Sequence, residues 1–271
     1  MIKAINAIKG RNSIIVAPHP RAKLTNKKIC DLMRAALEKM GAPADLVIGI
    51  ESPSLDLTNE LMQQCDRVLA TGGGAMVTAA YSSGTPALGV GVGNAVITVD
   101  ETADLNDAAE KIHLSKTLDL AASCSSDNSV LLVDSIYDEM LERLESKGGY
   151  LCNADEKAKL QATIWDAEGH LNTAVVAQPA QKIAAMAGLD VPPTTEFYIV
   201  SEDNWGPEHP FSGEKLCVTM ALYRARDIDH AIELTNNIQS YQGQGHSCGI
   251  YSTSDANIMK LADATHTSRV M

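Results

Sequence analysis

Short apolar runs alternate with longer amphipathic segments along the first part of the chain. Ser13–Ala17 is an apolar run that a proline ends, so it predicts a buried strand. Residues 26–40 carry apolar side chains at helical spacing, and Gly41 stands where a glycine commonly ends a helix. The same reasoning predicts further strands at 46–50, 67–70, 87–90 and 95–99, and helices at 57–65, 75–81 and 105–113.

The second part of the chain, from about Ser115, continues this alternation. It predicts strands at 129–133, 197–200, 217–223 and 248–251, and helices at 136–146, 154–165, 178–187, 228–238 and 256–264. Strands separated by helices of this length imply βαβ units and a parallel sheet. We therefore expect an α/β fold with two domains, one over residues 1–114 and one over residues 115–271.

Composition narrows the class of protein. The chain has 271 residues, of which 45% are hydrophobic and 21% charged, so it can bury a core without disulfides or metals. No apolar run reaches the roughly 18–20 residues of a membrane span, and no signal-peptide core follows Met1. We therefore expect a cytoplasmic protein without a membrane partner. Its six cysteines form no CxxC pair and are expected to be free thiols.

Charge is distributed unevenly. The total is −12, which argues against nucleic-acid binding because such proteins need cations to neutralise phosphates. Residues 1–41, however, hold nine cations and two anions, a formal charge of +7 that leaves −19 for the remainder. This segment is either a solvated helix face or a site for an anionic ligand such as a nucleotide.

Two glycine-rich segments follow predicted strands. In parallel sheets ligands bind at the carboxyl ends of strands, and Thr71–Gly74 and Gly89–Asn94 both stand at such ends. Glycines there let the backbone approach a phosphate, and a helix N-terminus attracts anions. Neither segment is a GxGxxG motif after the first strand, so tight turns and close packing remain the alternative.

Cys124 differs from the other five cysteines in its surroundings. It lies in the small polar loop Ala121–Ser129, which leads into a predicted strand. Small neighbours give access to the thiol, and loop N–H groups would stabilise an oxyanion. Cys124 is thus a candidate nucleophile, with an inert thiol as the alternative.

Two further residues are candidates for chemistry. His246 has glycines on both sides and is either an acid–base partner of a thiol or a structural hydrogen-bonding group. Glu214 precedes a predicted strand, and an exposed ion-pairing glutamate is its alternative. For a metal we expect no site, because His170, Glu208 and His209 are too scattered.

Several segments, taken in order, resemble the aldehyde dehydrogenase superfamily and within it the CoA-acylating branch. They are Arg11–Ile15 with Pro18–Ala22, Ala70–Val77, Gly84–Asn94, Ser115–Thr117 through Cys124 to Ser129, Glu214–Leu216 and Gly245–His246. The resemblance implies that residues 1–114 are a Rossmann-type nicotinamide- and CoA-binding domain and residues 115–271 the catalytic domain. It implies that Cys124 and His246 are catalytic. The implied cofactor contacts are Pro18, His19, Arg21, Thr71, Gly72, Gly73, Gly91 and Glu214.

By the same resemblance the reaction is the oxidation of a short aldehyde. The Cys124 thiolate attacks the aldehyde, NAD or NADP accepts a hydride, and coenzyme A takes the acyl group from the resulting thioester. Hydrolytic members carry a general-base glutamate in the strand that here reads Ala87–Gly91, which has no carboxylate. Since water activation needs such a base, its absence fits a thiol acceptor. His19-Pro20-Arg21 after the first strand brings no carboxylate to a ribose 2′-OH, so NADP stays open beside NAD.

Details of the branch add three expectations. Ser123–Ser125, Gly149–Cys152 and Trp165–His170 are most similar to the sulfoacetaldehyde type, with the acetaldehyde type close behind. Family members extend beyond both ends of the matching segment, with an oxyanion-hole asparagine on one side and chain that supports oligomerisation on the other. We therefore expect a fragment with weakened activity, whose full-length form is a homo-oligomer. The competing hypothesis is a nucleotide-binding or interaction module without catalysis, and a cysteine hydrolase would act without nicotinamide.

Overall fold

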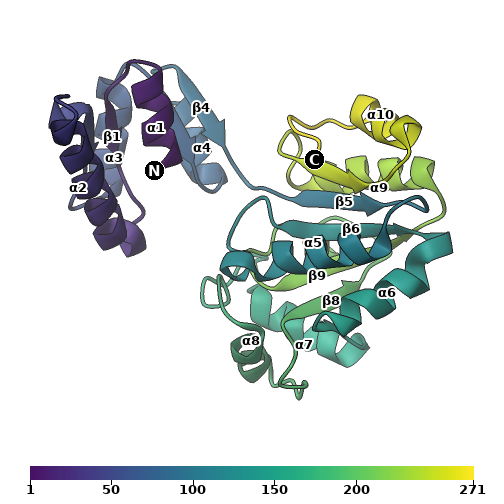
Figure 1. The fold of residues 1–271 in the computed structure, drawn as a ribbon. Helices are drawn as coiled ribbons and strands as arrows, with labels where there is room; N and C mark the ends of the chain where they lie inside the picture. Colours follow the sequence, from purple (N-terminus) through teal and green to yellow (C-terminus); the bar gives the residue numbers. More distant parts are fainter. The chain divides into compact units, whose positions relative to one another are not determined.

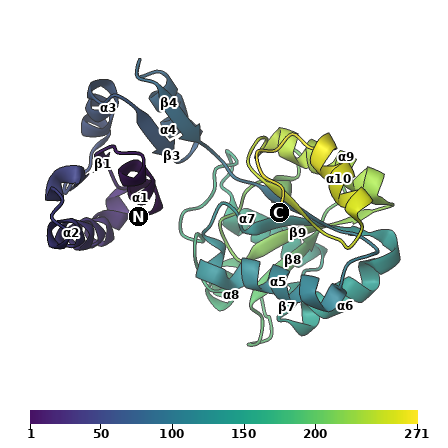
Figure 2. The same ribbon diagram turned by 45° about the horizontal axis from the view of Figure 1, so that its top comes forward.

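A computed structural model describes residues 1–271, and the chain forms two compact units (Figures 1 and 2). Unit 1 spans Met1–Gly91 and unit 2 spans Val92–Met271.

Unit 1 consists of short βα elements with two separate strand pairs. In chain order the elements are α1 (Ile2–Lys9), β1 (Ile14–Val16), α2 (Lys23–Lys39), β2 (Val47–Gly49), α3 (Leu55–Gln64), β3 (Val68–Thr71), α4 (Gly74–Tyr81) and β4 (Ala87–Val90). Strand β1 pairs in parallel with β2, and β3 pairs in parallel with β4. Each pair buries only a small apolar cluster, one around Val47 and one around Val68.

Unit 2 is built on one six-stranded parallel sheet. Its strands are β5 (Ala95–Val99), β6 (Asp127–Val133), β7 (Gly149–Leu151), β8 (Phe197–Ser201), β9 (Thr219–Ala225) and β10 (Cys248–Tyr251), in the order β10-β5-β6-β9-β8-β7. Its helices are α5 (Leu105–Thr117), α6 (Tyr137–Ser146), α7 (Ala154–Ile164), α8 (Ala180–Ala187), α9 (Ile228–Tyr241) and α10 (Asp255–Ala264). All five strand pairings are parallel.

Helices cover both faces of this sheet. Helices α5 and α6 lie on one face, whereas α7 and α9 lie on the other (Figure 1). The order of the strands explains this arrangement, because right-handed crossovers that move along the sheet in opposite directions place their helices on opposite faces. Polar caps begin several of the helices; Asn153 and Glu156, for example, form a reciprocal capping box at the start of α7.

The core of unit 2 runs along the central strands. Every residue of β5 and β6 is buried, as expected for strands covered on both faces. The register places one residue from each of four adjacent strands at the same level of the sheet: Cys248, Val96, Ser129 and Ala221. Loops that enter these four strands therefore meet at one edge, formed by the amino ends of the strands.

The predicted α/β class and the parallel sheet are confirmed. The division into compact units differs from the predicted boundary at residues 114 and 115, which falls inside α5. Strand β5 and helix α5 pack with β6 in unit 2, and periodicity along the chain carries no information about which sheet a strand joins. The hydrophobic pattern also missed α1 and the three-residue edge strand β7.

No helix of the structure is both long enough and apolar enough to cross a lipid bilayer.

Truncating a fully buried leucine tests the packing of unit 2. Leu131 lies in β6 and has no exposed surface, so Leu131→Ala should lower the free energy of unfolding of unit 2 by about 2–5 kcal/mol. Both tryptophans, Trp165 and Trp205, lie in unit 2, so tryptophan fluorescence during urea unfolding reports this unit. Leu114→Ala is the matched control, because Leu114 is 52% exposed and its truncation should change stability by less than about 0.5 kcal/mol. Equal losses in the two variants would contradict the described core.

Candidate active site

Four loops at the amino edge of the unit 2 sheet bring the candidate residues of this unit together. Gly93 precedes β5, Cys124 precedes β6, Glu214 precedes β9 and His246 precedes β10. These strands are neighbours in the order β10-β5-β6-β9. We expected Thr71–Gly74 and Gly89–Asn94 at carboxyl ends of strands, and Cys124 and Glu214 in loops that enter strands. Gly89–Asn94 does both, because its first two residues belong to β4 whereas Gly93 and Asn94 lead into β5. In unit 2 the candidates lie in loops before strands, not in the loops after strands that commonly bind ligands.

Cys124 lies in a turn against the backbone of Gly93. A Cβ atom added to Gly93 would lie 2.5 Å from the Cys124 carbonyl oxygen and 2.7 Å from the Cys124 Cβ atom. Only a glycine fits this approach. Cys124 is half-buried, whereas four other cysteines are buried and Cys65 in unit 1 is half-buried. Of the thiols in unit 2, Cys124 is therefore the accessible one.

Glu214 is tied to the same glycine. Its Oε1 atom accepts a hydrogen bond from the Gly93 N–H at 2.9 Å, and its own N–H donates to Gln242 Oε1 at 2.9 Å. Burial raises the pKa of the Glu214 carboxyl to about 7, although the Gly93 N–H and the neighbouring Lys215 act in the opposite direction. Glu214 is thus not the exposed ion-pairing residue of the alternative interpretation; it is a carboxyl held beside the Cys124 loop.

His246 is held by the loop that enters β10. Its N–H donates to the Gly243 carbonyl, and its Nδ1 atom lies 2.8 Å from Ser247 Oγ. Burial, with a smaller contribution from Arg269, lowers the pKa of His246, so the imidazole is neutral at pH 7. Gly243 in turn packs on Asn94, the residue after Gly93. His246 therefore belongs to the same edge as Cys124.

Sequence reasoning missed a buried amide pair beneath these loops. Asn128 Nδ2 donates to Asn94 Oδ1 and to the Gly213 carbonyl, while Asn94 Nδ2 donates to the carbonyls of Ser212 and Gln242. Both asparagines are at least 95% buried. Polar residues where apolar strands begin were the available signal, since Asn94 precedes β5 and Asn128 is the second residue of β6, but only the fold shows that the two amides meet.

Unusual backbone conformations precede Cys124. Asp119, Leu120 and Ala121 all have positive φ angles, between 49° and 57°, and none of them is a glycine. Left-handed conformations cost such residues roughly 1–2 kcal/mol each. Leu120 and Ala121 pack against the core of unit 2, which compensates for this strain. Strained backbone of this kind concentrates at functional sites, and here it aims the chain into the Cys124 turn.

The predicted cofactor residues of unit 1 follow three parallel strands. Pro18, His19 and Arg21 follow β1, where the His19 side chain accepts a hydrogen bond from the Arg21 N–H. Thr71 ends β3, and Gly72 and Gly73 lead into α4. Added Cβ atoms at Gly73 and Gly74 would meet nothing within 4 Å, and no side chain caps this helix. Gly91 follows β4. Each of these loops thus leaves the carboxyl end of a strand.

Part of the positive charge in residues 1–41 is already paired. Lys27 donates to Glu51 at 2.8 Å and lies 3.6 Å from Asp31, and the Glu51 hydrogen bond raises the pKa of this lysine. Arg21 and Lys23 are exposed and take part in no ion pair. Of the three cations that follow β1 most closely, these two are therefore better candidates for an anionic ligand than Lys27.

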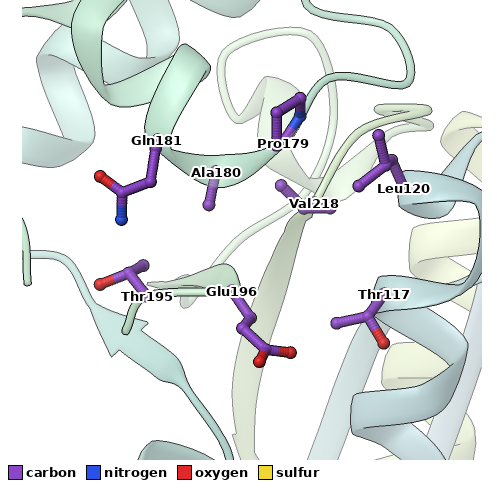
Figure 3. Close-up of a pocket in the computed structure, with 8 residues that line it drawn as sticks. All are labelled: Thr117, Leu120, Pro179, Ala180, Gln181, Thr195, Glu196 and Val218. Atoms are coloured by element: carbon purple, nitrogen blue, oxygen red, sulfur yellow. The ribbon is translucent and has the colours of Figure 1, made fainter. Parts of the chain in front are cut away.

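A hollow of about 230 Å³ also opens near the amino edge of unit 2 (Figure 3). It is lined by Thr117, Leu120, Pro179, Ala180, Gln181, Thr195, Glu196 and Val218. Leu120 belongs to the strained segment before Cys124, and Val218 precedes β9. The candidate residues Cys124, Glu214 and His246 are not among the lining residues, so the hollow lies beside the candidate site and is not its centre.

The structure brings His170 close to Asp166 and Glu168 in an exposed loop, with their ligand atoms within 4.8 Å of one another. The Asp166 carboxylate already accepts hydrogen bonds from the N–H groups of Glu168 and His170. His209 lies elsewhere, 3.3 Å from the buried Glu202 carboxylate. The Asp166 carboxylate closes its own loop, so the cluster is explained without an ion.

Comparison with known proteins assigns the chain to a family. The aldehyde dehydrogenase family model matches residues 1–162. The chain belongs to the aldehyde dehydrogenase family. A sulfoacetaldehyde dehydrogenase of an Acholeplasma species is 44% identical over 98% of this chain and 56% of its own length. The chain thus spans about half the length of the curated relatives it matches.

Solved structures agree with this family assignment. An acetylating aldehyde dehydrogenase of Geobacillus thermoglucosidasius superposes with a TM-score of 0.95 at 36% identity, over 99% of this chain and 60% of that one. A propionaldehyde dehydrogenase of Rhodopseudomonas palustris, solved with bound propionyl-CoA, gives a TM-score of 0.86 at 29% identity, over 96% of this chain and 57% of that one. The fold of both units is therefore that of acylating aldehyde dehydrogenases.

A methyl group at Gly93 tests the contact with Cys124. Gly93→Ala should lower the free energy of unfolding of unit 2 by about 1–3 kcal/mol, because the new methyl overlaps the Cys124 backbone. Urea unfolding followed by tryptophan fluorescence measures the loss. Leu114→Ala in unit 2 is again the control, since Leu114 is 52% exposed and its truncation should leave the unfolding midpoint nearly unchanged. An unchanged unfolding midpoint for Gly93→Ala would show that the two loops do not touch.

Titration of Glu214 should give unit 2 a pH-dependent stability. The pKa of its carboxyl is raised from 4.5 to about 7 in the fold, so the folded state binds the proton more tightly than the unfolded state. The resulting stabilisation is complete below about pH 4.5 and is lost as pH rises through 7. Asp127, whose pKa burial raises to about 6, adds a slope of the same sign at lower pH.

Replacing Glu214 by glutamine isolates the contribution of this carboxyl to the pH dependence. In Glu214→Gln the free energy of unfolding should fall less steeply between pH 6 and 7 than in wild type. The whole contribution of the carboxyl is roughly 1–2 kcal/mol after screening by solvent. The exposed Glu208→Gln is the matched control. Equal pH slopes in wild type and Glu214→Gln would refute the buried carboxyl.

Proposed function

We propose that this chain carries the catalytic core of an NAD(P)-dependent, CoA-acylating aldehyde dehydrogenase. The observation that supports this most directly is the edge of the unit 2 sheet, where the accessible Cys124 thiol, Glu214 and His246 lie on neighbouring loops. The relatives are named as enzymes, which favours catalysis over the competing hypothesis of a nucleotide-binding module.

Cys124 performs the covalent steps of the proposed reaction. Its thiolate adds to the aldehyde carbon to give a thiohemiacetal, which loses the hydride of its C–H bond and becomes a thioester. When bound, the oxidised nicotinamide supplies the acceptor for that hydride. The thiol of coenzyme A then attacks the thioester, the acyl-CoA departs, and the Cys124 thiolate is restored. The loop around Cys124 is rich in small residues, which leaves room for both substrates.

His246 and Glu214 have distinct proposed roles at this edge. The neutral His246 imidazole is suited to accept the proton of an incoming thiol, since a base must be unprotonated at the working pH. Glu214 is proposed to orient the nicotinamide ribose. Strand β4 reads Ala87–Val90 and offers no carboxylate to activate water. This supports a thiol as the acyl acceptor.

Unit 1 has features that suit a dinucleotide. The start of α4 has amide N–H groups without a side-chain cap, and open space around Gly73 and Gly74 would let a phosphate approach the backbone. We propose that Thr71, Gly72, Gly73 and Gly91 hold this part of the cofactor, and that Pro18, His19 and Arg21 hold the adenosine side. Exposed Arg21 is suited to a 2′-phosphate, so NADP is proposed as an alternative to NAD.

The aldehyde is proposed to be small, with sulfoacetaldehyde first and acetaldehyde second. The supporting observation is the name of the Acholeplasma relative, a sulfoacetaldehyde dehydrogenase. Coenzyme A as the co-substrate is supported by the propionyl-CoA in the Rhodopseudomonas structure. We also propose that the full-length form is a homo-oligomer. We propose further that residues 1–114 bind the cofactor and residues 115–271 carry the catalytic residues.

One assay tests the proposed function. The protein is incubated with sulfoacetaldehyde or acetaldehyde, NAD or NADP, and coenzyme A, while absorbance at the wavelength of the reduced nicotinamide is followed. Cys124→Ala should abolish the signal, because it removes the nucleophile. Cys65→Ala is the matched control, since Cys65 is the other half-buried thiol and lies in unit 1.

Mass spectrometry of the protein without coenzyme A provides the second readout. An acyl group should accumulate on the peptide that contains Cys124 and on no other cysteine. If neither reduced nicotinamide nor this adduct forms, the enzyme hypothesis fails for this chain. Product formation without nicotinamide would instead indicate a cysteine hydrolase.

A further inference from the structure

Buried polar side chains hold three consecutive carbonyl groups just before Glu214. Lys215 donates to the carbonyls of Phe211 and Gly213, Asn94 donates to that of Ser212, and Asn128 donates to that of Gly213. All three donors are nine-tenths or more buried. The loop that carries Glu214 is therefore held by side chains from two distant places in the chain, Asn94 and Asn128, and by Lys215 at its own end, and not by hydrogen bonds between strands.

The two asparagines also join segments that are far apart in sequence. Asn94 begins the path into β5, Asn128 lies in β6, and Asn94 reaches the Gln242 carbonyl at the end of α9. Gly243, which receives the His246 N–H on its carbonyl, packs directly on Asn94. The amide pair thus contacts the loops of Glu214 and His246. It lies where β5 and β6 begin, and the Cys124 loop leads into β6.

The pair satisfies backbone groups as well as its own amides. Apolar residues of similar shape would leave the carbonyls of Ser212 and Gln242 without these donors, so the hydrogen bonds of Asn94 hold both carbonyls in place. A buried polar network fixes a geometry that an apolar contact leaves open, because each N–H donor needs a carbonyl at one distance and in one direction. The pair therefore specifies a geometry.

We propose that Asn94 and Asn128 are positioning residues of the candidate active site, which hold the Glu214 carboxylate at the Gly93 N–H and thereby set the Glu214 loop against the Cys124 loop. This inference rests on the proposed function for its catalytic meaning. The geometry that carries it is the chain of contacts from the amide pair to Gly213, Glu214 and Gly93, and from Gly93 to Cys124.

Asn94→Asp is the sharpest test. The carboxylate keeps the size of the amide and still accepts from Asn128, but it cannot donate to the carbonyls of Ser212 and Gln242, and it faces both with negative charge. The matched control is Asn172→Asp. Asn172 is a half-buried residue of unit 2 that also donates to a carbonyl, that of Thr163, and accepts an N–H, that of Ala174.

The direct readout is hydrogen exchange of the Gly93 amide, measured by NMR on the full chain. Asn94→Asp should speed this exchange at least tenfold while amides inside β6 and β9 keep their protection, and Asn172→Asp should leave it within twofold. In the aldehyde oxidation assay, kcat should fall at least tenfold with little change in the KM for coenzyme A. Combining Asn94→Asp with Asn128→Leu should add little beyond either change, because both act through one network.

Uniform loss of protection across the sheet in Asn94→Asp, together with a lower unfolding midpoint, would show a purely structural role and overturn the proposal. So would a Gly93 amide that exchanges as in wild type. If Asn94→Asp does not fold, Asn128→Leu, which removes the donors without adding charge, is measured in its place. If the wild type forms no reduced nicotinamide, the proposed function fails, whereas the exchange measurement still decides whether the amide pair positions Glu214.

Discussion

The parallel register of β10, β5, β6 and β9 is the constraint on which the candidate site depends. Because all four strands run in one direction and start at one level, the loops that enter them meet at a single edge. Cys124, Glu214 and His246 are separated by up to 122 positions in the chain, and no local structure would bring them together. The site therefore exists only as long as the central sheet does, and the fully buried β5 and β6 make that sheet the most protected part of unit 2.

Close backbone contact turns this shared edge into a defined site. The absence of a side chain at Gly93 lets the Cys124 turn approach it, and the Gly93 N–H then faces the Glu214 carboxylate. One residue thus contacts the candidate nucleophile on one side and the candidate ribose ligand on the other. Beneath it, buried amides and the buried amino group of Lys215 hold the carbonyls of the Glu214 loop, so the approach of the two loops is set by hydrogen bonds of fixed geometry.

Family membership and geometry support each other on different points. Likeness to acylating aldehyde dehydrogenases accords with an accessible thiol in a loop of small residues, and the structure adds that partial burial raises the pKa of the Glu214 carboxyl to about 7. The absence of a carboxylate from β4 supports the proposed thiol acceptor, since no residue of that strand would deprotonate water. Unit 1 supplies strand ends and an uncapped helix start that suit a nucleotide, in accord with the excess of cations in its first 41 residues.

The amino-acid sequence by itself predicted most of the elements and their α/β class, and its resemblance to a family supplied most of the candidate residues. Periodicity and turn residues are local signals, and Cys124 and the Thr71–Gly74 segment stand out by their immediate neighbours. Only the tertiary structure decided that the unit boundary lies at Gly91, that the loops before β10, β5, β6 and β9 meet at one edge, and that Asn94 and Asn128 form a pair. Those facts depend on which strands become neighbours in the sheet. Packing between residues that are distant in sequence decides this order, so no short segment of the chain contains the information.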